Sequence, residues 1–258
     1  MNRTALITGT TSGIGYALCE KFAKESTDLI LVSRNREKLI SQQEDLQSRF
    51  GINVWIIAQD LGAPDAAENV YKELLIMNVN VDYLVQNAGF DMSGEFISID
   101  IEEEKEMIRL NIIFVTEFTK LMLPGMVERK SGKILFLGSV VSYVPSALNA
   151  VYSATKAYVL FFARAIRTEL KGTGVTVTVL CPGATDTGFA KRSGLEGSPA
   201  FKRFVMSAEK VADAGYKSMM KGRMKHTPGF YNKFIVFASK VFPASFIDGF
   251  ALKMFRSK

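Results

Sequence analysis

The stretch ALITGTTSGIGYALCEKFAK, residues 5–24, carries three structural signals in succession. Its apolar run at 5–8 predicts a buried strand, glycines follow at 9, 13 and 15, and an amphipathic pattern over 13–24 predicts a helix. Glycines let the backbone turn tightly, and the free N–H groups at a helix N-terminus attract phosphate groups. The stretch therefore predicts a strand, a phosphate-binding loop and a helix.

The same alternation of strand and helix patterns continues to about residue 188. Strands are predicted at 5–8, 29–33, 54–58, 83–86, 133–137 and 175–180, and helices at 13–24, 37–49, 64–77, 101–128 and 152–171. The strand runs are apolar nearly throughout, as in strands that are covered on both faces. We therefore predict an α/β fold, a single doubly wound Rossmann-type domain over residues 1–258 with a parallel sheet flanked by helices.

The pattern changes after residue 187. Two helices are expected over 193–206 and 208–221, and residues 188–221 are interpreted as a small helical substrate lid, because such sheets bind ligands beyond the carboxyl ends of their strands. Residues 230–258 form an apolar and basic tail, in which Pro243 and Gly249 are expected to interrupt any long helix. The tail either caps the pocket or forms a subunit interface, which we favour, or makes weak peripheral contact with a membrane surface.

Composition excludes several classes of protein. With 258 residues, 48% hydrophobic and 22% charged, the chain is neither disordered nor a disulfide miniprotein, and its net charge of +6 favours anionic ligands only mildly. The two cysteines, Cys19 and Cys181, lie far apart and near no His/Cys cluster, so reduced thiols and no metal site are expected. No signal peptide and no run near the roughly 18 apolar residues of a membrane-spanning helix is found, and we expect a cytoplasmic protein.

Two further features suggest chemistry. Tyr152 and Lys156 are four residues apart in a predicted helix, so the ammonium can lie beside the phenol and lower the cost of its ionisation. Arg34 follows the second strand, where a site that prefers NAD usually places an acid. A guanidinium suits a 2′-phosphate, which predicts NADP(H) as the cofactor; the alternative is a solvated surface arginine.

Taken together, these motifs resemble the short-chain dehydrogenase/reductase family over about residues 3–190. The matching positions are TGTTSGIG at 8–15, Asp60-Leu61, Asn87-Ala88-Gly89, Asn111, Gly138-Ser139, YSATK at 152–156, and Pro182-Gly183 with Thr185 and Thr187. One departure is Gln86, where the family more often has asparagine.

The resemblance implies a role for each matching residue. Tyr152 is expected to be the general acid or base, Lys156 to lower its pKa, Ser139 to orient the substrate oxygen, and Asn111 to hold a water of a proton relay. The expected cofactor-binding residues are Gly9, Thr11, Ser12, Gly13, Ile14, Gly15, Ser33, Arg34, Asp60, Leu61, Asn87, Ala88, Gly89, Tyr152, Lys156, Pro182, Gly183, Thr185 and Thr187. A homodimer or homotetramer through the helices at 101–128 and 152–171 is expected.

The predicted pocket is mostly apolar, which favours a hydrophobic carbonyl or alcohol substrate. Its expected lining is Phe90, Met92, Val140, Val141, Val144, Leu148, Phe189 and Leu195. The leading hypothesis is an NADPH-dependent carbonyl reductase or alcohol dehydrogenase, and the alternative is a 3-oxoacyl-thioester reductase acting on an acyl carrier protein or CoA substrate. A hypothesis of a different class is a non-catalytic NADP(H)-binding sensor. No nucleic-acid partner is expected, because no recognition module is found.

Overall fold

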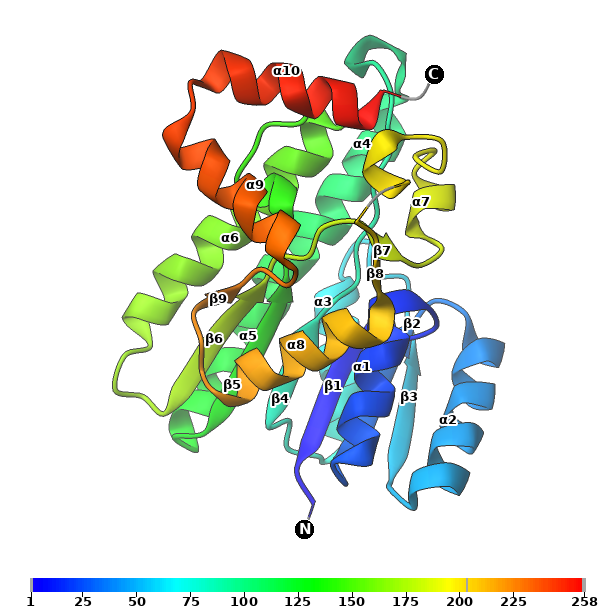
Figure 1. Ribbon diagram of the computed structural model, residues 1–258. Helices are drawn as coiled ribbons and strands as arrows, with labels where there is room; N and C mark the ends of the chain where they lie inside the picture. Colours follow the sequence, from blue (N-terminus) through cyan, green and yellow to red (C-terminus); the bar gives the residue numbers. More distant parts are fainter. Residues whose placement is uncertain (1, 203, 257–258) are drawn as a thin grey trace.

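A seven-stranded parallel sheet forms the centre of the molecule in the computed structural model, which describes residues 2–202 and 204–256 (Figure 1). Its strands are β1 Thr4–Thr8, β2 Asp28–Ser33, β3 Val54–Ala58, β4 Tyr83–Gln86, β5 Gly132–Leu137, β6 Val175–Leu180 and β9 Lys225–His226. They lie in the order β3-β2-β1-β4-β5-β6-β9. Because the order reverses between β1 and β4, a crevice opens there beyond the carboxyl ends of the strands. The predicted fold class is confirmed.

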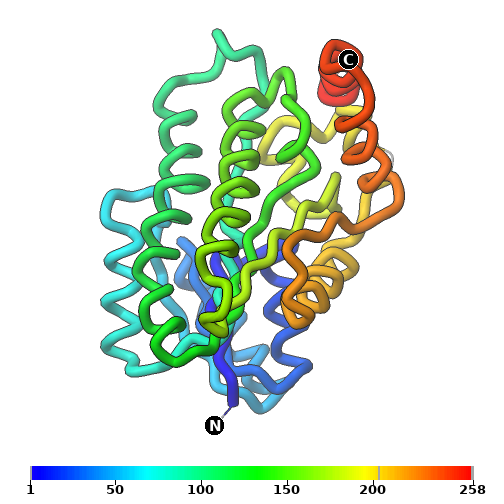
Figure 2. Tube along the Cα trace, turned by 90° about the vertical axis from the view of Figure 1, so that its left-hand side faces the viewer, coloured from blue at the N-terminus to red at the C-terminus, as the bar shows by residue number. Residues whose placement is uncertain are grey.

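Helices cover both faces of the sheet (Figures 1 and 2). One face packs against α1 Gly13–Lys24, α2 Arg36–Phe50 and α8 Ala208–Met220, and the other against α3 Ala66–Met77, α5 Val115–Glu128 and α6 Ala150–Glu169. Apolar side chains on each helix meet the mostly apolar strands β1 to β6 in two separate cores. The strands are therefore buried on both sides, as their sequences predict.

The helix predicted over 101–128 is divided by a change of helical pitch. It consists of α4 Ile101–Ile108, the π-helical segment η2 Arg109–Phe114, and α5. Among the described residues, this stretch is the one helix long and apolar enough to cross a membrane by length and composition, contrary to the sequence expectation. In this fold Phe118 and Met126 of α5 are fully buried in the core that α5 shares with α3 and α6.

The lid region differs most from its prediction. The expected helix at 193–206 is wrong: α7 Phe189–Arg192 and the 3-10 turn η4 Pro199–Phe201 are short, and β7 Thr185–Asp186 pairs with β8 Met206–Ser207. Gly194, with φ at +73°, ends the first helix, and Pro199 admits only a turn. The helix predicted at 208–221 does form, as α8. It packs on the sheet beside α1 rather than over the pocket, so its assignment to the lid is also wrong.

The tail folds into two helices at the end of the molecule where the strands terminate (Figure 1). These are α9 Phe230–Val241 and α10 Ala244–Phe255. Pro243 separates them as predicted, whereas Gly249 lies inside α10 without interrupting it. Ala238, Ile247 and Ala251 are buried in a small third core with Val144. The inner faces of α9 and α10 are thereby attached to the pocket wall.

Candidate active site

A cavity of about 440 Å³ opens in the predicted crevice. The segments following β1 to β6 all contribute to its lining, and α7, α9 and α10 close it from above. Of the residues predicted to bind the cofactor, all but Gly15 line this cavity, together with Ser139, Tyr152 and Lys156. The topology therefore gathers residues that are distant in sequence at one site.

The glycine-rich loop forms the floor of the cavity. Gly9 and Gly13 have φ of +70° and +56°, which places both in the region that favours glycine. The Asn87 side chain donates hydrogen bonds to the carbonyl oxygens of Thr8 (2.9 Å) and Gly9 (3.1 Å). A Cβ on Gly15 would collide with the Gly9 carbonyl oxygen, so Gly15 permits the close packing of the loop on α1 and is not itself part of the cavity lining. The loop leaves room for a diphosphate above α1.

Two cations line the part of the cavity beyond β2. Arg34 is 60% exposed, and its Nη1 lies 3.7 Å from both Asp60 Oδ2 and Glu106 Oε1. Lys38 lines the same region, and the sequence analysis did not identify it. Lys38 lies four residues after Arg34, at the start of α2, and this spacing could have indicated a second cation near the cofactor. Thr11 Oγ1 and Ser33 Oγ are 3.1 Å apart at this end of the cavity. The donors present fit a phosphate on the adenosine ribose.

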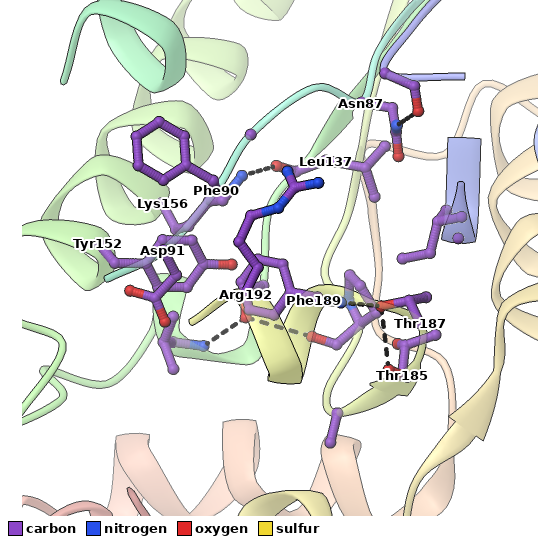
Figure 3. Close-up of a pocket in the computed structure, with 18 of the residues that line it drawn as sticks. Asn87, Phe90, Asp91, Leu137, Tyr152, Lys156, Thr185, Thr187, Phe189 and Arg192 are labelled. Atoms are coloured by element: carbon purple, nitrogen blue, oxygen red, sulfur yellow. Dashed lines mark hydrogen bonds between the residues drawn. The ribbon is translucent and has the colours of Figure 1, made fainter. Parts of the chain in front are cut away.

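Ser139, Tyr152 and Lys156 all line the cavity. Tyr152 and Lys156 lie near each other there (Figure 3). The Lys156 ammonium donates to the Leu137 carbonyl at 3.0 Å and lies 5.6 Å from the centre of the Tyr152 ring. Burial lowers the pKa of Lys156 to about 8. Burial raises the pKa of Tyr152, whereas its hydrogen bond with Ser139 lowers it. The three side chains have the proximity that proton transfer to a carbonyl oxygen requires.

Asn111 lies behind this group in the π-helical segment. Its amide donates to the Phe90 carbonyl and to Thr155 Oγ1, both at 3.1 Å, and it is buried without lining the cavity. A Cβ on Gly89 would lie 2.9 Å from Asn111 Oδ1 and 3.2 Å from Lys156 Nζ. Gly89 therefore keeps open the space between these two polar atoms. The role of Asn111 in a proton relay remains a prediction, which the position of its side chain supports.

Asp91 is the main site residue that the sequence analysis missed. Its carboxyl group is 2% exposed and lines the cavity beside Tyr152 (Figure 3). Burial raises the pKa of Asp91 to about 7, although the Lys156 ammonium opposes the shift. The Asn149 amide, in its donating orientation, is 3.1 Å from Asp91 Oδ2. An acid two residues after Asn87-Ala88-Gly89 was the available signal, but its burial was not apparent from sequence.

The outer half of the cavity is apolar, largely as predicted. Phe90, Val140, Val141, Val144, Phe189 and Leu195 line it. Met92 and Leu148 do not line it; Leu148 lies in a turn, and its carbonyl accepts a hydrogen bond from Gly94 N (2.8 Å). Additional apolar lining comes from the two C-terminal helices, including Ile235, Phe250 and Met254. Arg192 of α7 is a charged lining residue that the sequence analysis did not identify.

Comparison with known proteins identifies the family. Residues 3–196 match the family model described as short chain dehydrogenase. Human very-long-chain 3-oxoacyl-CoA reductase is 33% identical over 227 residues, 86% of this chain and 72% of that protein. A short-chain dehydrogenase from Sphingobium yanoikuyae in complex with NADPH is 30% identical, with a TM-score of 0.83 and 89% of each chain covered. Serine dehydrogenase complexed with NADP⁺ is 31% identical, with a TM-score of 0.75, over 87% of this chain and 92% of that one.

Fold, site and similarity agree on the class of protein. The chain belongs to the short-chain dehydrogenase family of oxidoreductases, as the sequence motifs indicate.

Proposed function

We propose that the protein is an NADPH-dependent reductase that transfers a hydride between the nicotinamide and the carbonyl or secondary alcohol of a hydrophobic substrate. The observation that carries the proposal is the position of Tyr152, Lys156 and Ser139 between a glycine-floored polar half and an apolar half of one cavity. A bound nicotinamide would supply the hydride. The chain would supply binding, orientation and the proton.

The choice of NADPH rests on charge at the end of β2. Arg34 and Lys38 line the cavity there, and the sequence Ser33-Arg34-Asn35-Arg36 contains no acid to bind a ribose 2′-hydroxyl. Two similar short-chain dehydrogenase structures hold NADPH or NADP⁺. The donors suit a 2′-phosphate better than a hydroxyl.

In the direction of reduction, Tyr152 donates its phenolic proton to the substrate oxygen. Ser139 donates a hydrogen bond to the same oxygen. The Lys156 ammonium offsets the charge of the phenolate that remains, and the space beside Gly89 and Asn111 is the route by which the proton is replaced. Burial, and next the Asp91 carboxyl, raise the pKa of Tyr152 and so favour the protonated form that reduction requires.

A 3-oxoacyl thioester is a second candidate substrate class. It is favoured by the similarity to human very-long-chain 3-oxoacyl-CoA reductase and by an apolar wall that extends to α10, which suits an acyl chain. The two candidate substrate classes differ in one group: a 3-oxoacyl thioester has a thioester carbonyl in addition to the ketone that is reduced, and a simple ketone does not.

A paired assay tests the proposal. NADPH consumption is followed with a long-chain methyl ketone and with a 3-oxoacyl thioester of matched chain length, using wild type and Tyr152→Phe. The proposal predicts turnover of at least one substrate by wild type and a loss of about 100-fold or more in the variant. NADPH binding without turnover of any member of a broad carbonyl panel would contradict it and favour the sensor hypothesis.

A further inference from the structure

The outward face of α9 is apolar, which is unusual for a surface helix. Phe230, Phe234, Phe237 and Val241 follow one another at helical spacing and are between 53% and 88% exposed. The face that carries Asn232, Ile235 and Ala238 is the one packed against the rest of the chain. Since surface helices normally direct their apolar stripe inward, α9 carries a second apolar stripe that the described chain leaves largely exposed.

Two phenylalanines extend this surface, Phe242 just after α9 and Phe246 in α10. They are 48% and 61% exposed, and their rings lie 5.5 Å apart. We call these two residues and the four above the aromatic face. A monomeric soluble protein seldom exposes so many large apolar side chains on adjoining helices without a partner.

Positive charge accompanies the aromatic face. From residue 230 to 256 the sequence contains Lys233, Lys240, Lys253 and Arg256 against a single acid, Asp248. Arg164 of α6, Lys225 of β9 and Arg223, which we call the basic band, add to this charge.

The cations of that band lie close to one another. Burial lowers the pKa of Lys225 on β9, and Lys240 and Arg164 lower it further. Burial likewise lowers the pKa of His226, with Lys233 and Arg223 contributing. Cations that approach one another in this way create a positive field suited to an anionic surface.

The same helices form the cavity wall. Ile235 of α9 and Phe250, Ala251 and Met254 of α10 line the cavity from their inner faces. Both helices lie at the end of the molecule beyond the carboxyl ends of the strands (Figures 1 and 2). A partner on the aromatic face would therefore lie next to the helices that enclose the substrate.

We propose that the aromatic face docks on the surface of an anionic phospholipid bilayer, with its phenylalanines at the boundary between headgroups and acyl chains and its cations against the headgroups. Basic amphipathic helices bind such surfaces by this combination of forces. A second copy of the chain fits less well, because a symmetric contact would place the cations of both copies in one interface, with only Asp248 of each copy to offset them. This inference stands independently of the proposed reaction.

Vesicle flotation tests the proposal. The full chain is mixed with vesicles of phosphatidylcholine alone, or of phosphatidylcholine with an equal amount of phosphatidylglycerol. We expect binding to the mixed vesicles that is at least about tenfold stronger than to phosphatidylcholine alone and that weakens with added salt. Phe237→Glu combined with Phe246→Glu should abolish binding, and Lys233→Gln combined with Lys240→Gln should weaken it severalfold.

A matched control lies on α3. Leu75 and Ile76 are 62% and 78% exposed, so Leu75→Glu combined with Ile76→Glu changes an equally exposed apolar pair far from the aromatic face and should leave binding intact. Circular dichroism checks that every variant is folded. Failure of wild type to bind the mixed vesicles would overturn the proposal. So would a dimer, measured by light scattering, that only the Phe237/Phe246 variant converts to monomer while wild type stays off the vesicles, since the face would then join two copies.

Discussion

Replacing Arg34 with alanine should weaken NADPH binding much more than NADH binding. NADH lacks the 2′-phosphate, so a residue that binds this group affects only one of the two cofactors. Arg34 stands at the cavity edge beyond β2, and Lys38 is the second cation in the same region.

The magnitude follows from the exposure and neighbours of Arg34. A hydrogen bond between charged groups contributes about 1.5–3 kcal/mol, and a guanidinium that is 60% exposed should lie near the lower end, because solvent screens it. About 1.5–2 kcal/mol corresponds to a loss of roughly 10–30-fold in NADPH affinity. Removal of Arg34 also leaves Asp60 and Glu106, each 3.7 Å from its Nη1, without this cation, and their charge then repels the phosphate.

Isothermal titration with NADP⁺ and NAD⁺ measures the two affinities directly. Arg36→Ala is the matched control, because Arg36 is exposed two residues away and does not line the cavity. NAD⁺ affinity should change by less than about threefold in both variants. Equal losses for the two cofactors in Arg34→Ala would refute the assignment of Arg34 to the 2′-phosphate.

Two further predictions concern stability. Gly15→Ala places a Cβ against the Gly9 carbonyl oxygen and 2.5 Å from Asn87 Nδ2, so it should lower the free energy of unfolding by about 1–3 kcal/mol and Tm by several degrees. Gly249→Ala is the control, because nothing lies within 4 Å of the added Cβ, and it should leave Tm unchanged. Equal Tm values for the two variants would contradict this prediction. Asp91 has a pKa raised from 3.8 to about 7, so the folded protein holds an extra proton in this range and is destabilised as pH rises through it. The Tm difference between Asp91→Asn and wild type should therefore shift in favour of the variant as pH rises from about 4 to 8, and a constant difference would contradict the shift.

The sheet and most cavity residues could be predicted because buried parallel strands are mostly apolar and most of the cofactor-binding motifs directly follow a strand. Strand β9 has no such signal, since it comprises only Lys225 and His226. The helix expected at 193–206 failed because Gly194 and Pro199 outweigh the apolar pattern around them.

Other features depend on tertiary structure. The burial of Asp91 involves Asn149 and Lys156, which are far away in sequence, so the acid after Asn87-Ala88-Gly89 could be seen but its burial could not. The sequence does not say which face of α9 points outward, so a membrane contact stood beside the favoured pocket and interface roles of the tail.

The central claim is that Tyr152 protonates a substrate oxygen while a bound nicotinamide supplies the hydride. The most direct measurement compares wild type with Tyr152→Phe for NADPH oxidation by the matched ketone and 3-oxoacyl thioester, alongside NADPH affinity. The account predicts that the variant loses turnover by about 100-fold or more and keeps NADPH affinity within about threefold. Turnover by Tyr152→Phe at the wild-type rate would contradict it.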